Sequence, residues 1–428
     1  MKHVLIVGGG FAGLNVAKNL VHRKDLKVTL IDRRNHHLFQ PLLYQVAMAG
    51  LSPADIATPI RTILAEYKNS EVVLGNVKGV DLKNRKVQTD VGEYSYDYLV
   101  LACGAQHSYF GHNNWEEFAP GLKTLEQATE IRRRILLAFE KAETEHNLEI
   151  QKRLLTFIVI GGGPTGVELA GALGEISRFT LGSDFHFADP RRTRIILIEA
   201  GARILPQFSE ELARRAVRDL ENLGVQVWTS SRVTDVNSEG VTVGAERVLA
   251  STVLWAAGVQ PSSLNKLLDV PLDSSGRVIV EPTLNLKNFA EVFVLGDQAH
   301  VEDNAQKALP GLAPVALQEG VATARNIVNA LNNKPLIIFS YVDKGQMATI
   351  GRKKAIAEVG NFKFSGFLAW MMWLVIHIYF LIGFKNRLFV MLEWAWSYFT
   401  FKRGARLILN KEWRLNPAQN NSTEKREQ

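Results

Sequence analysis

Two glycine-rich segments of the chain have the spacing of a phosphate-binding turn. Gly8–Gly13 and Gly161–Gly166 both follow the pattern G-x-G-x-x-G. In such a turn the first glycine permits a tight bend, the second lets the backbone approach a pyrophosphate, and the third lets the next helix pack closely on the strand. The N-terminus of that helix then faces the phosphates, whose negative charge it stabilises. Two copies predict that one chain binds two dinucleotides.

The first glycine-rich segment is flanked by the elements that a dinucleotide site needs. An apolar strand, Val4–Val7, leads into Gly8, and apolar residues at helical spacing follow Gly13. A second strand is predicted over Lys27–Ile31 and ends in Asp32, 24 residues after Gly8. A carboxylate in this place can hydrogen-bond both hydroxyls of an adenosine ribose. Strand, turn, helix and terminal acid together favour a dinucleotide site over a glycine-rich turn in an unrelated α/β fold.

The second segment repeats the arrangement over a longer stretch of chain. The strand Phe157–Ile160 precedes the glycines, and a helix is predicted to continue to about Thr180. The next strand, Arg194–Ile198, ends in Glu199, 38 residues after the first glycine of the turn. The polar stretch Leu181–Thr193, rich in Gly, Asp, Pro and Arg, accounts for the extra length as a surface loop.

The two sites are most economically filled by FAD and a nicotinamide dinucleotide. A flavin accepts hydride and releases electrons to other acceptors, so it is the natural junction between two substrates. Glu199 would repel a ribose phosphate, which favours NADH over NADPH. Arg203, about one helical turn further on, could instead bind such a phosphate, so NADPH remains an alternative substrate.

Three more segments have the pattern of a strand that ends at glycine. They are Tyr96–Ala105, Val253–Gly258 and Val292–Asp297. The carboxylate of Asp297, next to glycine, could hydrogen-bond a ribityl hydroxyl while backbone amides approach the pyrophosphate. Each segment alone is equally an ordinary strand with a turn, and only their order around the two glycine-rich turns favours a binding role.

Composition bounds the class of protein. A chain of 428 residues with 46% hydrophobic and 22% charged residues is long enough for two or three globular domains. Its single cysteine, Cys103, excludes a disulfide framework or a thiol-pair redox site within one chain and fits a reducing compartment. The first residues show no secretory leader, because an apolar strand follows Met1 almost at once. No set of residues predicts a metal site.

The C-terminal part is basic, rich in tryptophan and interrupted by apolar runs. Residues 364–428 hold nine lysines and arginines against four glutamates, and five of the eight tryptophans. The apolar runs favour a membrane surface over nucleic acid. Phe364–Phe384 contains no Lys, Arg, Asp or Glu and is long enough to span a bilayer. Leu388–Phe401 is too short to span and has its polar residues at helical spacing.

The preferred interpretation is two helices that lie in one leaflet, so that a lipid-soluble substrate can reach a flavin from the bilayer. Lys402, Arg403 and Arg406 would then bind anionic headgroups. A single transmembrane helix over 364–384 and a buried dimerisation helix remain as alternatives. The polar residues 415–428 are predicted to be disordered.

Seven sequence motifs together make the chain similar to a known family. Residues 1–330 resemble the flavoprotein reductases with two dinucleotide sites, and most of all the type II, non-proton-pumping NADH:quinone oxidoreductases. The motifs are GGGFAG at 8–13, FQPLLYQVA at 39–47, LACGA at 101–105, GGGPTGVELAGAL at 161–173, IEAGARILP at 198–206, WAAGV at 255–259 and LGDQA at 295–299.

The resemblance implies one non-covalent FAD in the first site, NADH in the second, and a quinone on the flavin face away from the nicotinamide. It assigns FAD-binding roles to Gly8, Gly10, Phe11, Ala12, Gly13, Asp32, Arg33, Leu43, Val77, Ala102, Gly104, Gly296, Asp297 and Ala316. It assigns NADH-binding roles to Gly161, Gly163, Pro164, Thr165, Gly166, Glu168, Glu199, Ala257 and Gly258.

The family's quinone motif, A-Q-x-A-x-Q, corresponds to residues 313–318. Ala313, Ala316 and Gln318 match, but Pro314 replaces the first glutamine, which puts one quinone hydrogen bond in doubt. Gln318 could donate to a quinone carbonyl or, alternatively, pair with backbone as a structural residue. Cys103 also departs from the threonine common at its position and is expected to be structural.

Glu168 lies one turn into the second nucleotide-binding helix and has two interpretations. It could hold the nicotinamide amide or relay protons to reduced quinone, as the resemblance favours. Alternatively, it is an acid near a helix N-terminus that interacts with the helix dipole. Glu168 and Gln318 are the candidate catalytic residues.

The predicted fold is α/β, with two Rossmann-like domains and a C-terminal amphipathic helical region that binds the membrane. The divisions are 1–150 for FAD, 151–265 for NADH, 266–330 for the return to the FAD domain with the quinone motif, 331–414 for membrane association, and the disordered 415–428. The predicted place is the cytoplasmic face of the cell membrane, with a homodimer possible and no nucleic-acid partner.

Three alternatives remain from the sequence. A soluble NAD(P)H reductase of a small electron-transfer protein is disfavoured by the apolar C-terminal part. A sulfide:quinone oxidoreductase would need more than one reactive cysteine. A non-catalytic NADH-binding sensor or interaction protein belongs to a different class and would bind the dinucleotide without oxidising it.

Overall fold

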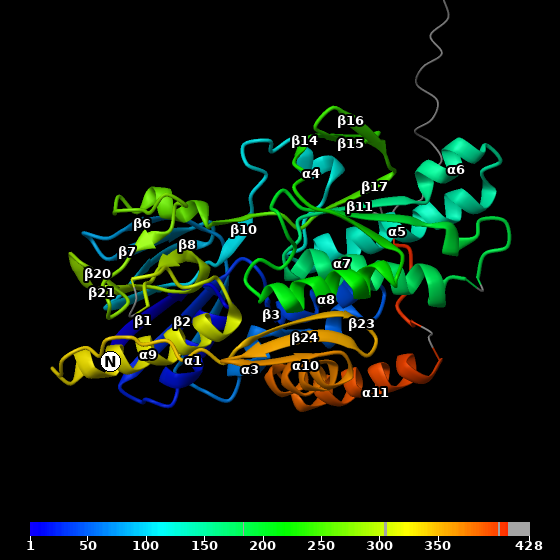
Figure 1. Cartoon of the computed structure of the whole chain (residues 1–428). Helices are drawn as coiled ribbons and strands as arrows, with labels where there is room; N and C mark the ends of the chain where they lie inside the picture. Colours follow the sequence, from blue (N-terminus) through cyan, green and yellow to red (C-terminus); the bar gives the residue numbers. More distant parts are fainter. Residues whose placement is uncertain (183, 304–305, 401–402, 410–428) are drawn as a thin grey trace, which may run out of the picture.

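The computed structural model describes residues 1–182, 184–303, 306–400 and 403–409, and it contains two parallel sheets built around the glycine-rich turns (Figure 1). The first sheet has the order β20-β21-β9-β1-β2-β5, parallel except for β20. Its apolar strands are covered on both faces, as parallel sheets require. The strands are β1 (Lys2–Val7), β2 (Leu26–Asp32), β5 (Ser70–Leu74), β9 (Tyr98–Leu101), β20 (Asn285–Leu286) and β21 (Phe289–Val294).

The second sheet is parallel throughout and has the order β13-β12-β11-β17. In Figure 1 two helices, α7 (Pro164–Glu175) and α8 (Glu210–Glu221), lie below it. The predicted continuation of α7 to Thr180 is present as a π-helical turn, Ile176–Thr180. The strands are β11 (Thr156–Ile160), β12 (Arg194–Ile198), β13 (Val225–Trp228) and β17 (Thr252–Trp255).

The chain leaves the first sheet, builds the second and then returns to the first. The chain passes from the first sheet to the second through β10 (Ala105–His107) and returns through β18 (Val259–Pro261). These two strands pair antiparallel. After β21 the chain forms α9 (Ala313–Leu331), which packs on α1 (Phe11–Leu20), and Asn15 Nδ2 donates to the backbone oxygen of Leu317 at 2.6 Å. The exact domain boundaries stay a prediction.

Smaller elements complete the two units. The remaining helices are α2 (Leu43–Ala47), α3 (Ile60–Leu64), α4 (Trp115–Phe118), α5 (Leu125–Thr144) and α6 (Leu148–Leu154). The remaining strands before residue 331 are β3 (His36–Leu38), β4 (Ala57–Pro59), β6 (Val77–Asp81), β7 (Lys86–Thr89), β8 (Gly92–Ser95), β14 (Val233–Asn237), β15 (Gly240–Val243), β16 (Glu246–Leu249), β19 (Val278–Ile279) and β22 (Ala299–His300).

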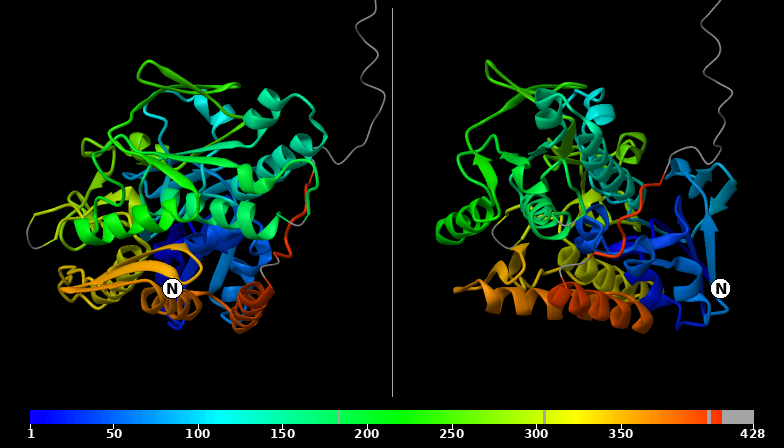
Figure 2. Two further views of the ribbon diagram at one scale, coloured as in Figure 1. Left: turned by 45° about the vertical axis from the view of Figure 1, so that its right-hand side comes forward. Right: turned by 90° about the vertical axis from the view of Figure 1, so that its right-hand side faces the viewer.

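The C-terminal part contains a sheet that was not predicted. Its strands are antiparallel and are followed by two helices along one edge of the molecule (Figure 2). The elements are β23 (Gln346–Gly351), β24 (Lys354–Val359), β25 (Phe362–Ser365), α10 (Phe367–Phe380) and α11 (Phe384–Thr400).

The apolar run 364–384 does not form one helix. It begins in β25, bends at Gly366, whose φ is +71°, and ends in a turn that contains Gly383, whose φ is +90°. Among the described residues, no helix combines the length and apolarity needed to cross a bilayer. The single spanning helix is therefore wrong for this run. The predicted disordered tail, 415–428, lies outside the described residues.

The C-terminal sheet is fastened to the second sheet through α7. The backbone oxygen of Ile350 in β23 lies 1.8 Å from where a Cβ of Gly171 would stand. Trp373 of α10 is 2% exposed and belongs to the same apolar core as α7, α5 and β11. The C-terminal helices are thus part of the folded body and not an appended tail.

We expect Gly171→Ala to lower the free energy of unfolding by about 1–3 kcal/mol, because the new methyl group meets backbone that cannot move cheaply. This outcome runs against helix propensity, which favours alanine by about 1 kcal/mol. Denaturant unfolding followed by tryptophan fluorescence measures it. Gly79→Ala, where the nearest atom is 3.5 Å away, is the control. An unchanged midpoint in Gly171→Ala would contradict this packing.

Candidate active site

The two glycine-rich turns have the same backbone geometry. Gly8 has a φ of +104° and Gly161 a φ of +109°, a region that residues with a Cβ rarely adopt. A Cβ on Gly8 would lie 2.3 Å from the oxygen of Ala102, in the neighbouring strand end. A Cβ on Gly13 or Gly166 would lie 2.0 or 1.8 Å from the oxygen of the turn's first glycine. Both turns are therefore fixed by contacts that only glycine allows.

The middle glycine of each turn, Gly10 or Gly163, is glycine for a different reason. A Cβ on Gly10 or Gly163 would meet no atom within 4 Å. Inside the protein nothing requires glycine at these two positions. Open space beside the N-terminus of a helix is what a pyrophosphate would fill.

The acids that end the second strands are held in the same way in both copies. Asp32 and Glu199 each accept from the backbone N–H of the residue after the turn's first glycine and from the residue two positions beyond the acid. The donors are Gly9 (2.6 Å) and Arg34 (2.7 Å) for Asp32, and Gly162 (2.6 Å) and Gly201 (2.6 Å) for Glu199. Because each carboxylate oxygen has a second lone pair, both acids can still accept from ribose hydroxyls.

One cavity of about 2400 Å³ brings most of the predicted residues together. The FAD candidates that line it are Gly8, Gly10, Phe11, Ala12, Asp32, Arg33, Val77, Ala102, Gly104, Gly296, Asp297 and Ala316. It is also lined by Pro164, Thr165 and Glu168 from the second turn, and by Ala313 and Gln318. Gly13 and Leu43 are buried behind its wall. The other NADH candidates, Gly161, Gly163, Gly166, Glu199, Ala257 and Gly258, are not among its lining residues.

The residues of the first turn fit an FAD. His37, in β3, was not predicted as a site residue. Its ring donates from Nδ1 to the oxygen of Gly9 at 2.9 Å, and its buried Nε2 has no partner among the described residues. Burial lowers the pKa of His37, so the ring is neutral. The bond from Nδ1 fixes the backbone of Gly9, next to the open space at Gly10 where a pyrophosphate would lie. The signal in the sequence was a histidine inside a short strand five residues after Asp32.

The segment Gly296–Gln298, which carries Asp297, is held from several sides. Glu319 of α9 accepts from the backbone N–H of Gly296 at 2.6 Å. Burial raises the pKa of Glu319 to about 7, although this hydrogen bond acts in the opposite direction. Gln298 accepts from the backbone N–H of Cys103 at 2.8 Å and exchanges hydrogen bonds with Asn265. These contacts fix the backbone on which the ribityl-binding carboxylate is predicted to stand.

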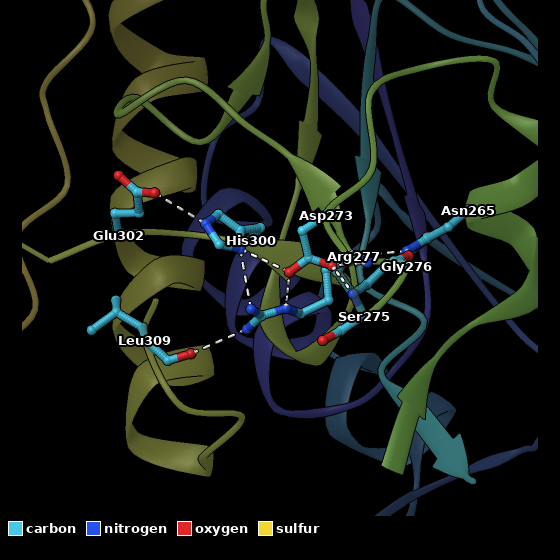
Figure 3. A network of polar contacts seen from close by, with 9 residues as sticks. Asn265, Asp273, Ser275, Gly276, Arg277, His300, Glu302 and Leu309 are labelled. Carbon is cyan, nitrogen blue, oxygen red and sulfur yellow. Dashed lines mark hydrogen bonds and ion pairs between the residues drawn. The ribbon is translucent and has the colours of Figure 1, made fainter. Parts of the chain in front are cut away.

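A polar network supports this segment from the surface side (Figure 3). Asn265 donates to the oxygen of Gly276, and Asp273 accepts from Arg277 at 2.8 Å and from His300 at 2.8 Å. Burial alone would raise the pKa of Asp273, but the hydrogen bonds from Arg277 and His300 outweigh it and hold that pKa at about 2. Asp273 is therefore ionised at neutral pH and binds two separate loops together.

Glu168 faces the shared cavity from α7. Burial raises the pKa of Glu168 to about 8, with a backbone hydrogen bond from Thr349 acting against it. Tyr44 lines the same cavity, and its hydroxyl accepts from Gln45 Nε2 at 3.0 Å. Gln45 in turn accepts from Trp394 Nε1 of α11 at 2.7 Å. A carboxyl that keeps its proton at neutral pH thus lies in a cavity wall connected to the C-terminal helices.

The side-chain amide of Gln318 forms hydrogen bonds with the backbone of Val342. Its Nε2 donates to the oxygen of Val342 at 2.9 Å, and its Oε1 accepts from the N–H of Val342 at 3.0 Å. The amide keeps one N–H and one lone pair for a ligand in the cavity. Pro314 stands in the first turn of α9, where its missing N–H costs no helical hydrogen bond.

Two further cavity residues were missed as site residues. Phe39 begins the family motif at 39–47, and His377 lies in α10; both line the cavity. Their rings meet edge to face with centroids 6.2 Å apart. The sequence signal at His377 was a single imidazole in an otherwise apolar run.

Comparison with known proteins places the chain in a family. The model of the pyridine nucleotide-disulphide oxidoreductases matches residues 2–320, and that of the NDH2 C-terminal domain matches residues 344–403. The type II NADH:quinone oxidoreductase Ndh of Mycobacterium tuberculosis is 41% identical, over 96% of this chain and 90% of that protein. The chain belongs to the type II NADH:quinone oxidoreductases.

Other relatives support this assignment. The mitochondrial internal alternative NAD(P)H-ubiquinone oxidoreductase A1 of Arabidopsis thaliana is 32% identical, over 92% of this chain and 84% of that protein. The fold matches the structure of NDH2 from Plasmodium falciparum in complex with NADH, with a TM-score of 0.86 over 96% of this chain and all of that chain, at 20% identity. The resemblance to type II NADH:quinone oxidoreductases expected from the motifs is confirmed, and with it the α/β fold class and the FAD and NADH cofactors.

We expect this family member to use NADH at least about tenfold more efficiently than NADPH, a difference of about 1.4 kcal/mol. The reason is the negative charge of Glu199, held by two backbone N–H groups where a 2′-phosphate would lie. Glu199→Gln should narrow the gap in kcat/KM, measured with ferricyanide as acceptor. Equal efficiencies in the unmodified protein would refute the assignment of Glu199.

Proposed function

We propose that this type II NADH:quinone oxidoreductase oxidises NADH and reduces quinone within one cavity that opens towards a membrane surface. The observation that carries the proposal is the lining of that cavity. The glycine-rich turns contribute Gly10 and Pro164, while the C-terminal helix α10 contributes Ile376 and Phe380. A dinucleotide site and apolar, exposed helices therefore share one continuous space.

The nucleotide side of the cavity would position FAD and NADH and exclude water. The first turn, Asp32 and His37 would hold FAD, which when bound accepts hydride and passes electrons on to a second acceptor. The second turn and Glu199 would orient NADH so that the nicotinamide meets the flavin near Glu168. Phe39 and Tyr44 pack against the same space and limit water there.

Glu168 is proposed as the group that holds a proton for quinone reduction. With a pKa of about 8 it is protonated at neutral pH and loses its proton as the pH rises through that value. Reduction of a quinone to a quinol consumes two protons, so a protonated carboxyl beside the flavin supplies one without crossing bulk water.

We expect reoxidation of the reduced flavin by quinone to slow as the pH rises above about 8. Glu168→Gln should remove this dependence and lower the rate by on the order of a hundredfold, the lower end of what general acid catalysis typically contributes. Stopped-flow traces at pH 6.5–9 measure both effects. Glu221→Gln, on the exposed part of α8, is the control and should keep the wild-type profile. If Glu168→Gln kept the pH profile of the unmodified enzyme, a group other than Glu168 would supply the proton for quinone reduction.

The quinone side is proposed to be formed by α9 and α10. Ala313 and Ala316 leave space beside the flavin end of the cavity, and Gln318 has one free amide N–H to offer a carbonyl. Gln318 also fastens Val342 and thereby the segment that leads to β23. Its role in quinone binding stays a prediction.

The membrane surface is proposed to be the outer face of α10 and α11. Along both helices large apolar side chains are exposed, among them Leu368, Val375, Tyr379, Leu392 and Phe399. Exposed apolar stripes with basic neighbours are typical of helices that lie in the membrane interface. The two helices lie at the lower edge in Figure 1, away from α6. Binding at the cytoplasmic face and pairing into a homodimer are further parts of this proposal.

The basic residues after α11 do not take the role expected from the sequence. Arg403 contacts Glu175 at 3.2 Å and donates to the oxygen of Met48 at 2.8 Å. Arg406 pairs with Asp184. Both therefore fasten the chain to the protein and do not serve lipid headgroups, while Lys402 lies outside the described residues.

A deletion from residue 364 would not test membrane binding alone, because it would also remove Trp373 from the core. We instead expect Val375→Glu and Leu392→Glu to weaken binding to anionic vesicles by on the order of tenfold each, since a carboxylate on this face must enter the interface. Vesicle sedimentation measures it. Leu148→Glu, on α6, is the control, because Leu148 is at least as exposed as Val375 and Leu392. If all three variants bind alike, the membrane surface lies elsewhere.

The enzymatic proposal is tested directly by a flavin spectrum of the purified protein and by NADH oxidation with a soluble quinone, ferricyanide and a ferredoxin. Quinone reduction is expected. Electron transfer to ferredoxin alone would favour a soluble reductase. Bound NADH without turnover would favour a sensor.

A further inference from the structure

The run from Phe364 to Phe384 contains one side chain that can bear a basic charge, His377. It lies on α10, whose outer residues Val375 and Ile376 are exposed, yet His377 itself is half-buried and lines the large cavity. The proposed function gives this residue no role so far. An imidazole in such apolar surroundings requires an explanation.

The ring of His377 is held in one orientation. It stacks on Trp373, one turn earlier, with centroids 4.0 Å apart and planes at 25°. Its Nδ1 lies 2.7 Å from the backbone oxygen of Trp373. Phe39 closes the other side edge-on. Stacking, hydrogen bond and edge contact together fix which ring atom meets the cavity.

This geometry also fixes what the second nitrogen can do. A carbonyl oxygen only accepts, so Nδ1 must carry the hydrogen. Burial lowers the pKa of His377 to about 4, and the ring is neutral at neutral pH. Nε2 is then an acceptor without a hydrogen, and among the described residues it has no hydrogen-bond partner.

We propose that Nε2 of His377 accepts a hydrogen bond from a hydroxyl of the quinol formed in this cavity, an inference that rests on the function proposed above. A quinone carbonyl carries no hydrogen and cannot form this bond. The residue therefore distinguishes the reduced headgroup from the oxidised one, and it binds product without taking part in proton or electron transfer. His377 is thus a second polar contact for the headgroup, contributed by the proposed membrane helix.

Two isosteric substitutions separate this role from a structural one. Asparagine places an amide nitrogen where Nδ1 stands and can keep the bond to Trp373, but it has no atom at Nε2. Glutamine reaches the position of Nε2 with an amide and loses the Nδ1 bond. If the ring mattered only for the fold of α10, His377→Asn would be the milder change. If the acceptor matters, His377→Gln is the milder one.

The experiment measures product inhibition of the full-length, FAD-loaded enzyme with a short-chain ubiquinone as substrate and its quinol as inhibitor. We expect His377→Asn to raise the inhibition constant of the quinol by about tenfold, the effect of one hydrogen bond. The KM of the quinone should change by less than about twofold, and His377→Gln should keep the inhibition constant near that of the unmodified enzyme.

Two results would overturn the proposal. Equal inhibition constants in all three proteins would show that Nε2 makes no bond to quinol. A parallel rise of the quinone KM and the quinol inhibition constant in His377→Asn would show a change of cavity shape. Absence of quinone reduction in the unmodified enzyme, with NADH oxidation by ferricyanide intact, would instead overturn the proposed function itself and this inference with it.

Discussion

The close packing of α7 on β23 is the contact on which the arrangement of the cavity depends. Gly171 has no side chain because the oxygen of Ile350 occupies the place where one would stand. This contact brings the helix that begins at the second glycine-rich turn directly against the C-terminal sheet. Glu168, three residues earlier on α7, is placed against Thr349 of the same strand and faces the cavity. Burial raises the pKa of this carboxyl to about 8, and the hydrogen bond from Thr349 only partly opposes that rise.

The same body carries contacts between the C-terminal helices and the flavin side. Trp394 of α11 donates to Gln45, and Gln45 donates to Tyr44 in the cavity wall. Further along the chain, Arg403 contacts Glu175 at the end of α7. Partly buried ion pairs of this kind leave an uncompensated charge when one partner is removed, so they resist displacement of the segment. The helices proposed to touch the membrane are therefore positioned against the cavity by specific side chains, and not only by apolar contact.

Sequence reasoning succeeded where the structure depends on local pattern. Residue types at short spacing predicted both glycine-rich turns and the strands before them. They also predicted the acids Asp32 and Glu199. The strand pairing confirms that the strand before each turn lies beside the strand that leads to the acid. The ligand-binding roles predicted for the residues of the FAD, NADH and quinone sites stay predictions. A sequence pattern can indicate which residues line a cavity, but it cannot indicate which of them bind a ligand.

What the sequence could not indicate depends on contacts between distant parts of the chain. The strand β24 has alternating small and apolar residues, but its place beside α8 is decided by packing across more than a hundred residues. The same holds for Arg403, which looked like a headgroup ligand until its partner Glu175, 228 positions away, was known.

The distribution of titratable groups along the cavity follows from the cost of burying charge. On α7, the carboxyl of Glu168 remains neutral by keeping its proton. On α10, the imidazole of His377 remains neutral by losing its proton. Burial pushes the pKa of an acid up and that of a base down, so one cause yields a proton donor and a hydrogen-bond acceptor in the same cavity. An uncharged quinone headgroup entering from a bilayer would thus meet no net charge from either residue at neutral pH. Its reduced form would meet both a group that has given a proton and one that can accept a hydroxyl hydrogen bond.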